Sequence, residues 1–319
     1  MKTIVILGAA GRIGDAASKA FMSAGWRVKG LVRGRNGAEL HPDAEWIKAD
    51  ATDREALVDA CSGADVVLNA LNPEYTEWDR KVLPMAENVI AACEAAGATQ
   101  LLPGNVYNFG HGVGLGMSED MPETPSTPKA RIRIAMEDLF QRRASEAGVQ
   151  TLVLRAGDFY GGTKPGSWLD LFILSKLKKD VFTWPGPMDV PHAFAYLPDL
   201  ASAFVALAEA RRDLPAFDRY HFAGHALTGA EMMAATEQAV GRKLQRRGVP
   251  WTLLRAGGLF MPILREVAVM SYLWRTPHSL DGSKLTERVG PLSSTDPVKA
   301  IRQAVSDQSL DRALVSSAA

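Results

Sequence analysis

The chain has 319 residues, and its 36 Lys and Arg side chains balance 36 Asp and Glu, so the formal net charge is zero. This length suits one large domain or two domains with a well-buried core. With 47% hydrophobic and 23% charged residues, the composition excludes disordered, collagen-like and coiled-coil classes. The charge balance argues against nucleic acid or a membrane surface as the main partner, because both need a local surplus of Lys and Arg.

The number of cysteines and the length of the apolar runs indicate the cellular compartment of the protein. Two cysteines, Cys61 and Cys93, are too few for a disulfide framework or a thiolate zinc cluster, which indicates a reducing compartment. The apolar run at the N-terminus breaks at glycine before a signal sequence is complete. No uncharged window approaches the ~18 apolar residues of a membrane span. We therefore expect a cytoplasmic protein.

Short apolar runs alternate with helical patterns through the first half of the chain, which is typical of β–α–β units. Strands are predicted at residues 3–7, 26–32, 45–48, 65–71, 100–103 and 151–155. Helices are predicted at residues 13–24, 54–61, 79–96 and 129–147. This order predicts an α/β fold with a doubly wound parallel sheet.

After Gly157 the alternation loosens, and glycine and proline interrupt the chain as in loops that shape a pocket. Helical patterns return at residues 199–210, 229–240 and 253–274. We expect a first domain over residues 1–157, to which strands and helices near 188–210 and 217–228 return. A smaller region is expected to cover residues 158–187 and 229–319.

A glycine-rich motif, GAAGRIG, follows the first apolar strand directly and opens a helix. Glycines there permit a tight turn and let the backbone approach a pyrophosphate, while the helix N-terminus offers unpaired N–H groups to the anion. In this context the motif predicts a dinucleotide-binding Rossmann domain rather than an ordinary strand-to-helix turn. The residues expected to contact the cofactor are Gly8, Ala10, Gly11, Arg12, Ile13 and Gly14.

The second predicted strand ends in arginines where an NAD-binding fold usually places an acid for the ribose 2′-hydroxyl. Arg33 and Arg35 stand there instead, and a guanidinium can pair with a 2′-phosphate. The pattern therefore favours NADP(H) over NAD(H), with Arg12 as a further member of the phosphate clamp. The alternative is a pair of solvated surface arginines.

Two more strand ends are expected beside the cofactor. Asp50 and Ala51 follow the third strand, where a carboxylate can accept a hydrogen bond from the adenine amino group. Asn69, Ala70 and Leu71 close the fourth strand beside the expected ribose. Helix capping and turn formation are the alternative roles of these residues.

Motifs along nearly the whole chain resemble the extended short-chain dehydrogenase/reductase superfamily, specifically the NAD-dependent epimerase/dehydratase family. The matching segments read GAAGRIG, KADATD, NVYNFG, TLVLRAGDFYGG, HAFAYLPDLASAFVAL and LDGSKLTERVG. The resemblance implies a Rossmann domain followed by a smaller C-terminal substrate-binding domain. It also implies a small-molecule substrate and a monomer or homodimer.

Alignment with that family predicts that its catalytic residues are replaced in this chain. The family uses a Ser and a Tyr-x-x-x-Lys pair, in which the Tyr exchanges a proton with the substrate and the Lys lowers the pKa of the Tyr. Alignment on Glu137 puts Lys129 at the Tyr position and Arg133 at the Lys position, and the Ser position falls on Pro103 or Gly104. This departure resembles the atypical branch of the superfamily.

Other side chains remain able to do chemistry. Lys129 and Arg133 lie one helical turn apart, so Arg133 can keep the ribose contact while a desolvated Lys129 donates a proton. The alternative is a phosphate or ribose clamp without proton transfer. Tyr107 and Asn105 are candidates to bind a substrate carbonyl, although the Tyr107 ring can equally be a packing residue.

Candidate substrate contacts come from the second half of the chain: His192, Trp168 and Phe159. The spacing of His221 and His225 is that of a zinc motif, but no third ligand accompanies them, and no metal site is expected.

Three functions are compatible with this sequence. The first is an NADP(H)-dependent oxidoreductase acting on a carbonyl or hydroxyl of a small molecule, with Lys129 or Tyr107 as the proton donor. The second is a regulatory or redox-sensing protein that binds NADP(H) without turnover. The third is a nucleotide-sugar epimerase or dehydratase, which is weaker because such reactions usually depend on the replaced Tyr.

Overall fold

A seven-stranded parallel sheet forms the centre of the computed structural model, which describes residues 1–34 and 41–311. All five residues of β1 (Thr3–Leu7) are buried because helices cover both faces of the sheet, and this explains its continuous apolar sequence. The strand order is β10-β6-β5-β4-β1-β2-β3. The other strands are β2 (Arg27–Val32), β3 (Glu45–Lys48), β4 (Val66–Asn69), β5 (Thr99–Gly104), β6 (Thr151–Arg155) and β10 (Phe217–His221).

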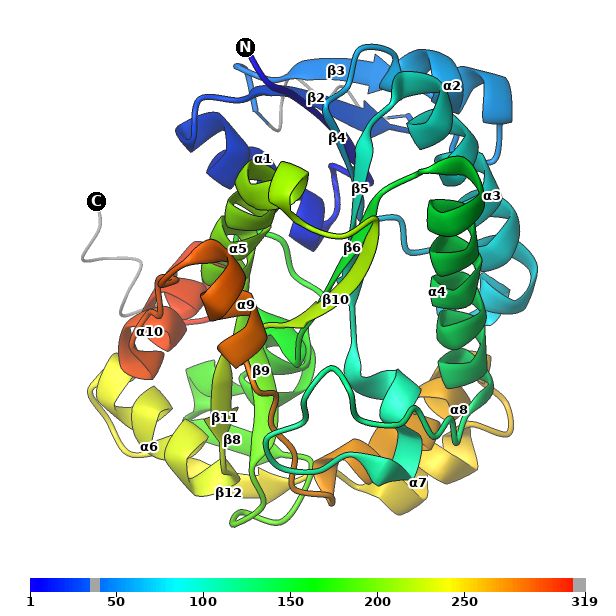
Figure 1. The fold of residues 1–319 in the computed structure, drawn as a ribbon. Coiled ribbons are helices and arrows are strands. Elements are labelled where there is room, and N and C mark those ends of the chain that lie inside the picture. Colours follow the sequence, from blue (N-terminus) through cyan, green and yellow to red (C-terminus); the bar gives the residue numbers. More distant parts are fainter. Residues whose placement is uncertain (35–40, 312–319) are drawn as a thin grey trace.

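Helices form a layer on each side of this sheet (Figure 1). On one side, α1 (Arg12–Ser23) packs against α5 (Leu197–Ala210). The other side carries α2 (Arg54–Cys61), α3 (Trp78–Ala96) and α4 (Pro128–Ala147). The chain order reverses where β1 lies between β2 and β4, and in open α/β sheets ligands bind at the carboxyl ends of strands beside such a reversal.

A second group of elements lies beyond the carboxyl ends of the main strands (Figure 1). Its two small sheets have the orders β11-β9-β7 and β12-β8 around an aromatic core. The strands are β7 (Asp158–Tyr160), β8 (Val181–Trp184), β9 (His192–Tyr196), β11 (His225–Leu227) and β12 (Gln245–Gly248). The helices are α6 (Gly229–Val240), α7 (Trp251–Gly257), α8 (Pro262–Val269) and α10 (Pro297–Asp307), whereas α9 (Ser283–Val289) packs against α5 and β10. Of the segments near 188–210 and 217–228 that were expected to return to the first domain, α5 and β10 join the main layers. By contrast, β9 and β11 pair with each other in a small sheet.

The prediction of one continuous helix over residues 253–274 is wrong. The segment forms α7, a turn, α8 and a final 3₁₀ helix at Met270–Trp274. Gly257 and Gly258 weaken the first helix, and Pro262 begins the next one because it supplies no backbone N–H to a preceding turn. The other predicted strands and helices agree with the structure to within two residues at each end.

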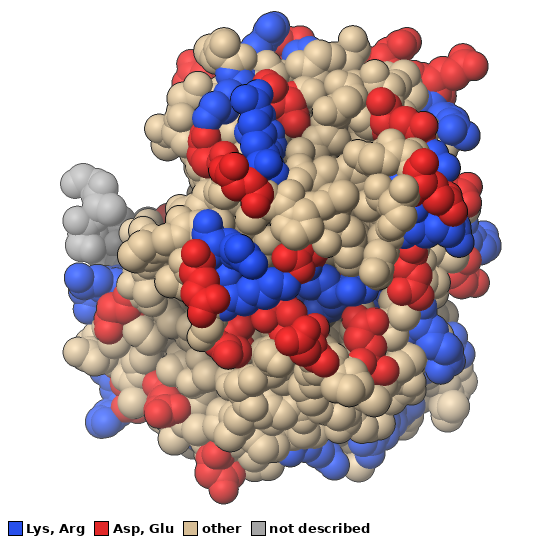
Figure 2. Space-filling view, in the orientation of Figure 1, with Lys and Arg blue, Asp and Glu red and all other residues tan. Residues whose placement is uncertain are grey.

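Charged residues are distributed unevenly over the molecule. Figure 2 shows Lys and Arg crossing the middle of one face with Asp and Glu beside them, and broad areas without charge. The zero net charge is therefore an average over distinct regions. Among the residues that the structure describes, no helix is long and apolar enough to cross a bilayer.

Candidate cofactor and substrate site

The turn between β1 and α1 accepts only glycine at its first position. Gly8 has a φ of +77°, and a Cβ added there would lie 2.7 Å from the carbonyl oxygen of Ala70. No side chain caps the N-terminus of α1 at Gly11. The first N–H groups of this helix therefore remain available, and together with the close backbone approach they fit a dinucleotide pyrophosphate.

Arg12 links this turn to the loop that follows β7. Its Nη2 donates to the carbonyl oxygen of Phe159 at 2.7 Å, and its Nη1 donates to that of Gly166 at 3.3 Å. Burial lowers the pKa of the Arg12 guanidinium, and the charges of Asp170 and Asp158 act in the opposite direction. Arg12 thus holds two parts of the site together and does not extend toward Arg33.

The end of β2 presents Arg33 to solvent, where it makes no hydrogen bond or ion pair with any residue the structure describes. Arg35, the second predicted phosphate ligand, lies outside the described residues. Beyond β3, Asp50 Oδ1 accepts hydrogen bonds from the backbone N–H and the hydroxyl of Thr52, at 2.9 and 2.8 Å. These bonds lower the pKa of Asp50, and Arg33 adds a smaller contribution. Ala51 is buried behind this turn.

A narrow cleft joins the end of β4 to α4. Its lining includes Asn69 and Leu71 from the end of β4, Trp78 of α3 and Arg133 of α4. The Arg133 guanidinium carbon lies 4.9 Å from the centre of the Trp78 ring, and its buried Nε has no partner among the described residues. Burial lowers the pKa of Arg133, and Glu137 acts against this effect. The structure therefore brings together the two groups that were predicted to lie beside the cofactor ribose.

Two tyrosines and a lysine lie next to this cleft. The hydroxyls of Tyr75 and Tyr107 are 3.2 Å apart, and burial raises the pKa of both phenols. The Lys129 ammonium lies 5.0 Å above the Tyr75 ring and forms an ion pair with Glu266 of α8. Burial and the nearby charge of Arg265 lower the pKa of Lys129. Both phenols consequently carry their protons at neutral pH, whereas Lys129 is engaged by a carboxylate.

Asn105 and His192, which were predicted to contact the substrate, form hydrogen bonds and packing contacts with other residues of the chain. Asn105 Oδ1 accepts a hydrogen bond from the backbone N–H of Tyr107 at 3.0 Å and so fixes the loop after β5. His192 is buried, stacks on Trp274 with ring centres 3.9 Å apart, and has its Nε2 2.8 Å from Asp158 Oδ2. The partly exposed carboxylate of Asp158, rather than the His192 ring, thus faces the region of the tyrosines.

Trp168 and Phe159 have different surroundings. The Trp168 ring packs on Phe172 and Trp274, with ring centres 4.6 and 5.1 Å apart, inside the aromatic core of the second group of elements. Phe159 contributes its carbonyl oxygen to Arg12. Sequence reasoning did not single out Tyr75 or Asp158. Only their positions in the sequence could have indicated them, because Tyr75 follows β4 and Asp158 follows β6, at the carboxyl ends of main-sheet strands where ligands bind.

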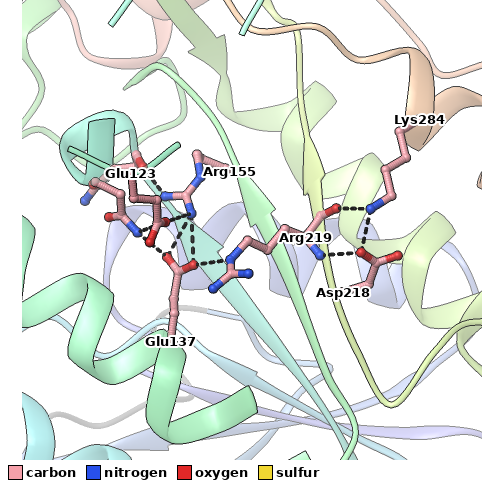
Figure 3. Close-up of polar contacts among 8 residues, drawn as sticks. Glu123, Glu137, Arg155, Asp218, Arg219 and Lys284 are labelled. Atoms are coloured by element: carbon pink, nitrogen blue, oxygen red, sulfur yellow. Dashed lines mark hydrogen bonds and ion pairs between the residues drawn. The ribbon is translucent and has the colours of Figure 1, made fainter. Parts of the chain in front are cut away.

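A buried charge network fixes the position of α4 (Figure 3). Glu137, only 1% exposed, accepts hydrogen bonds from Arg155 at 2.9 and 3.0 Å and from Arg219 Nε at 2.8 Å. Asn108 Nδ2 donates to the same carboxylate at 3.0 Å. Burial alone would raise the pKa of Glu137, but the two guanidinium groups hold it below its ordinary value. Because Arg133 lies one helical turn before Glu137, this network also sets the position of Arg133.

His221 and His225, the pair with zinc-motif spacing, make structural contacts instead. His225 Nδ1 lies 2.8 Å from the Tyr160 hydroxyl and its Nε2 lies 2.8 Å from the carbonyl oxygen of Thr295. His221 Nδ1 lies 2.8 Å from the carbonyl oxygen of Met117. Within residues 1–34 and 41–311, no three His, Cys, Asp or Glu side chains gather in a way that could hold a metal ion.

Comparison with known proteins agrees with this architecture. The sequence model of the NAD dependent epimerase/dehydratase family matches residues 4–223. The chain belongs to this family. Among curated proteins, no sequence matches it.

Solved structures of the family share the fold of the whole chain at low identity. UDP-glucose-4-epimerase from Stenotrophomonas maltophila, with bound NAD and formylated UDP-arabinopyranose, has a TM-score of 0.77 at 17% identity and covers 100% of both chains. UDP-glucuronic acid 4-epimerase from Bacillus cereus, in complex with UDP-glucuronic acid and NAD, has a TM-score of 0.75 at 16% identity and covers 95% of this chain and 97% of its own. UDP-glucose 4-epimerase from Brucella ovis, in complex with NAD, has a TM-score of 0.74 at 16% identity with the same coverage.

Proposed function

We propose that the protein is an NADP(H)-dependent oxidoreductase of the atypical short-chain dehydrogenase/reductase type, acting on a carbonyl or hydroxyl of a small molecule. The observation that carries this proposal is the hydroxyl pair of Tyr75 and Tyr107 beside Arg133. This pair supplies a hydroxyl group that carries its proton at neutral pH, in a chain where the usual Tyr and Lys of the family are replaced. The glycine turn and the cleft from Asn69 to Arg133 support dinucleotide binding.

The residues of the chain would handle the proton. The nicotinamide supplies or accepts a hydride when bound. In the reducing direction, the Tyr107 hydroxyl donates its proton to the substrate oxygen as negative charge develops there. The Tyr75 hydroxyl, 3.2 Å away, then returns a proton to Tyr107, and the partly exposed Tyr75 takes up a proton from solvent, so one proton is consumed for each hydride transferred. The positive charge of Arg133 stabilises the transient phenolate.

Cofactor preference rests on Arg33, which is exposed at the end of β2 with no acid in the usual ribose-binding position. We expect Arg33→Asp to weaken NADPH binding at least about tenfold, because a charge-assisted hydrogen bond to the 2′-phosphate is lost, and to change NADH binding little. Dissociation constants of both nucleotides, measured by calorimetry, provide the test. Arg142→Asp, an exposed arginine of α4, is the matched control. Equal affinities of the unmodified protein for NADPH and NADH would overturn the NADP(H) preference.

A second candidate is nucleotide-sugar epimerisation with retention of the cofactor. It is favoured by family membership and by the similarity to NAD-bound UDP-sugar epimerases. The two functions differ in net cofactor use. An oxidoreductase consumes NADPH when it reduces a carbonyl compound, which is followed as a loss of absorbance at 340 nm over a panel of such compounds. An epimerase interconverts UDP-sugars, which chromatography detects, without net consumption of the cofactor.

A binding protein without turnover is the third candidate. The ion pair between Lys129 and Glu266 favours this candidate. It engages Lys129, which stands at the family's Tyr position, so that side chain is not free to exchange a proton with a substrate. Tight NADPH binding without turnover of any carbonyl compound or UDP-sugar would support this candidate and would contradict the proposed reaction.

A further inference from the structure

The turn between α7 and α8 exposes three consecutive large apolar side chains, which we call the apolar tip. Leu259 is 82% exposed, Phe260 is 87% exposed and Met261 is 53% exposed. Single exposed apolar residues are ordinary on protein surfaces, but three adjacent ones at the end of a helical hairpin are not. The tip therefore needs a partner that accepts apolar side chains.

The tip is an ordered turn with its backbone groups hydrogen-bonded locally. The N–H groups of Phe260 and Met261 donate to the carbonyl oxygen of Gly257 at 3.0 and 2.9 Å, and that of Leu259 donates to Ala256 at 3.2 Å. The base of the hairpin is anchored by Trp251, whose buried Nε1 donates to the carbonyl oxygen of Pro185 at 2.6 Å. Such a turn can enter an apolar medium without leaving these backbone donors unpaired.

The segment around the tip is strongly basic. Residues 245–275 contain five arginines and a single acid, Glu266, which is already paired with Lys129. Arg255 and Arg265 flank the tip closely along the chain. All five arginines are exposed: Arg246, Arg247, Arg255, Arg265 and Arg275.

The hairpin also lies at an extremity of the molecule. In Figure 1, α7, α8 and β12 occupy the end opposite to β3. A flat surface can therefore approach the apolar tip without meeting the main sheet. An apolar tip flanked by Arg255 and Arg265 matches the boundary between the acyl chains and the phosphate headgroups of an anionic bilayer.

We propose that the apolar tip inserts into the surface of an anionic lipid bilayer, with the flanking Arg255 and Arg265 on the lipid phosphates. Self-association through this surface is disfavoured, because a twofold interface would bring the same arginines of two copies together. The proposal revises the expectation drawn from zero net charge, since the basic segment is compensated by acids elsewhere in the chain. It is independent of the reaction that the protein catalyses.

Sedimentation with lipid vesicles tests the proposal on the full-length protein. We expect binding to vesicles of phosphatidylcholine mixed with phosphatidylglycerol, weaker binding to phosphatidylcholine alone, and a loss of binding in high salt. The double variant Leu259→Ser/Phe260→Ser should lower the partition coefficient at least about tenfold, whereas Phe260→Leu should retain it. These exposed positions leave folding unchanged, which circular dichroism verifies.

A charge variant and its control complete the design. Arg255→Gln/Arg265→Gln should lower binding to the anionic vesicles, whereas Arg142→Gln/Arg212→Gln, which removes two exposed arginines from α4 and the segment after α5, should not. Absence of sedimentation with anionic vesicles at low salt would overturn the proposal. Vesicle binding that does not change with the tip substitutions would also overturn it. So would a dimer, detected by light scattering, that dissociates when the tip residues are substituted.

Discussion

At the scale of single residues, the replaced family positions retain charge but change partners. Lys129 and Arg133 both face the segment at residues 75–78, where each cation lies over an aromatic ring. A buried guanidinium beside two phenols favours the phenolate form, which is the role of the usual Lys in the family. Burial outweighs this effect and raises the pKa of both tyrosines, so both carry a proton at neutral pH.

The Tyr107 hydroxyl is expected to be essential for turnover. Tyr107→Phe should lower kcat by about 10²- to 10⁴-fold and leave the dissociation constant of NADPH nearly unchanged, because only the proton donor is lost. Since burial raises the pKa of Tyr107, the unmodified enzyme should show no loss of reduction rate between about pH 6 and pH 9 from deprotonation of this group. Steady-state kinetics across this range checks both points. Tyr220→Phe, on β10, is the control, and an unchanged kcat for Tyr107→Phe would remove this hydroxyl from the reaction.

Lys129 is expected to act mainly through its ion pair. Lys129→Met should reduce kcat less than about tenfold but should lower the free energy of unfolding by about 1–3 kcal/mol, because Glu266 loses its partner in a partly buried position. The double variant Lys129→Met/Glu266→Gln should recover part of this loss. Denaturant unfolding measures the stability of each protein. A kcat reduced as strongly as in Tyr107→Phe would instead make Lys129 the proton donor.

At the scale of elements, local sequence patterns predicted most strands and helices but not the directions of side chains. Apolar runs and the terminating Gly97 and Gly148 depend on neighbouring residues in the chain, and the elements that they delimit were predicted nearly in full. The helical hairpin was missed because an apolar period continues across Gly257 and Pro262. The hydrogen bond between Tyr75 and Tyr107 could not be predicted, because it depends on the contact between the loop after β4 and the loop after β5 at the carboxyl ends of these strands.

The β1–α1 turn allows a test of the cofactor site at this scale. Gly8→Ala should lower NADPH affinity by at least about tenfold and reduce stability by about 1–3 kcal/mol, because it combines a positive φ with a contact against Ala70. Gly114→Ala is the control, since an added Cβ there meets nothing within 4 Å. Calorimetry and denaturant unfolding measure the two effects. Unchanged NADPH affinity in Gly8→Ala would place the dinucleotide elsewhere.

At the scale of the whole molecule, the buried network around Glu137 joins parts that are distant in the sequence. It connects α4 with β6 through Arg155, with β10 through Arg219, and with the loop after β5 through Asn108. Sequence reasoning used Glu137 only to align the helix, because ion pairing between separate elements leaves no local pattern. A network of this kind positions the face of α4 that carries Arg133 and also makes stability depend on a single carboxylate.

Replacement of this carboxylate tests that dependence. Glu137→Gln keeps the shape of the side chain but leaves the buried Arg155 with only its longer contact to Glu123, at 3.4 Å, and removes the carboxylate partner of the partly buried Arg219. We therefore expect a loss of about 3 kcal/mol in the free energy of unfolding at pH 7. Because the folded-state pKa of Glu137 is lowered, its stabilising contribution is complete above the unfolded-state pKa of about 4.3 and disappears as the pH falls through the folded-state value. The stability gap between the unmodified protein and Glu137→Gln should therefore be wide at pH 7 and narrow in acid, whereas Glu87→Gln, at an exposed position of α3, should show little gap at either pH. Denaturant unfolding over this pH range measures the gap, and a gap that stays constant would mean that shape, rather than charge, is what Glu137 contributes.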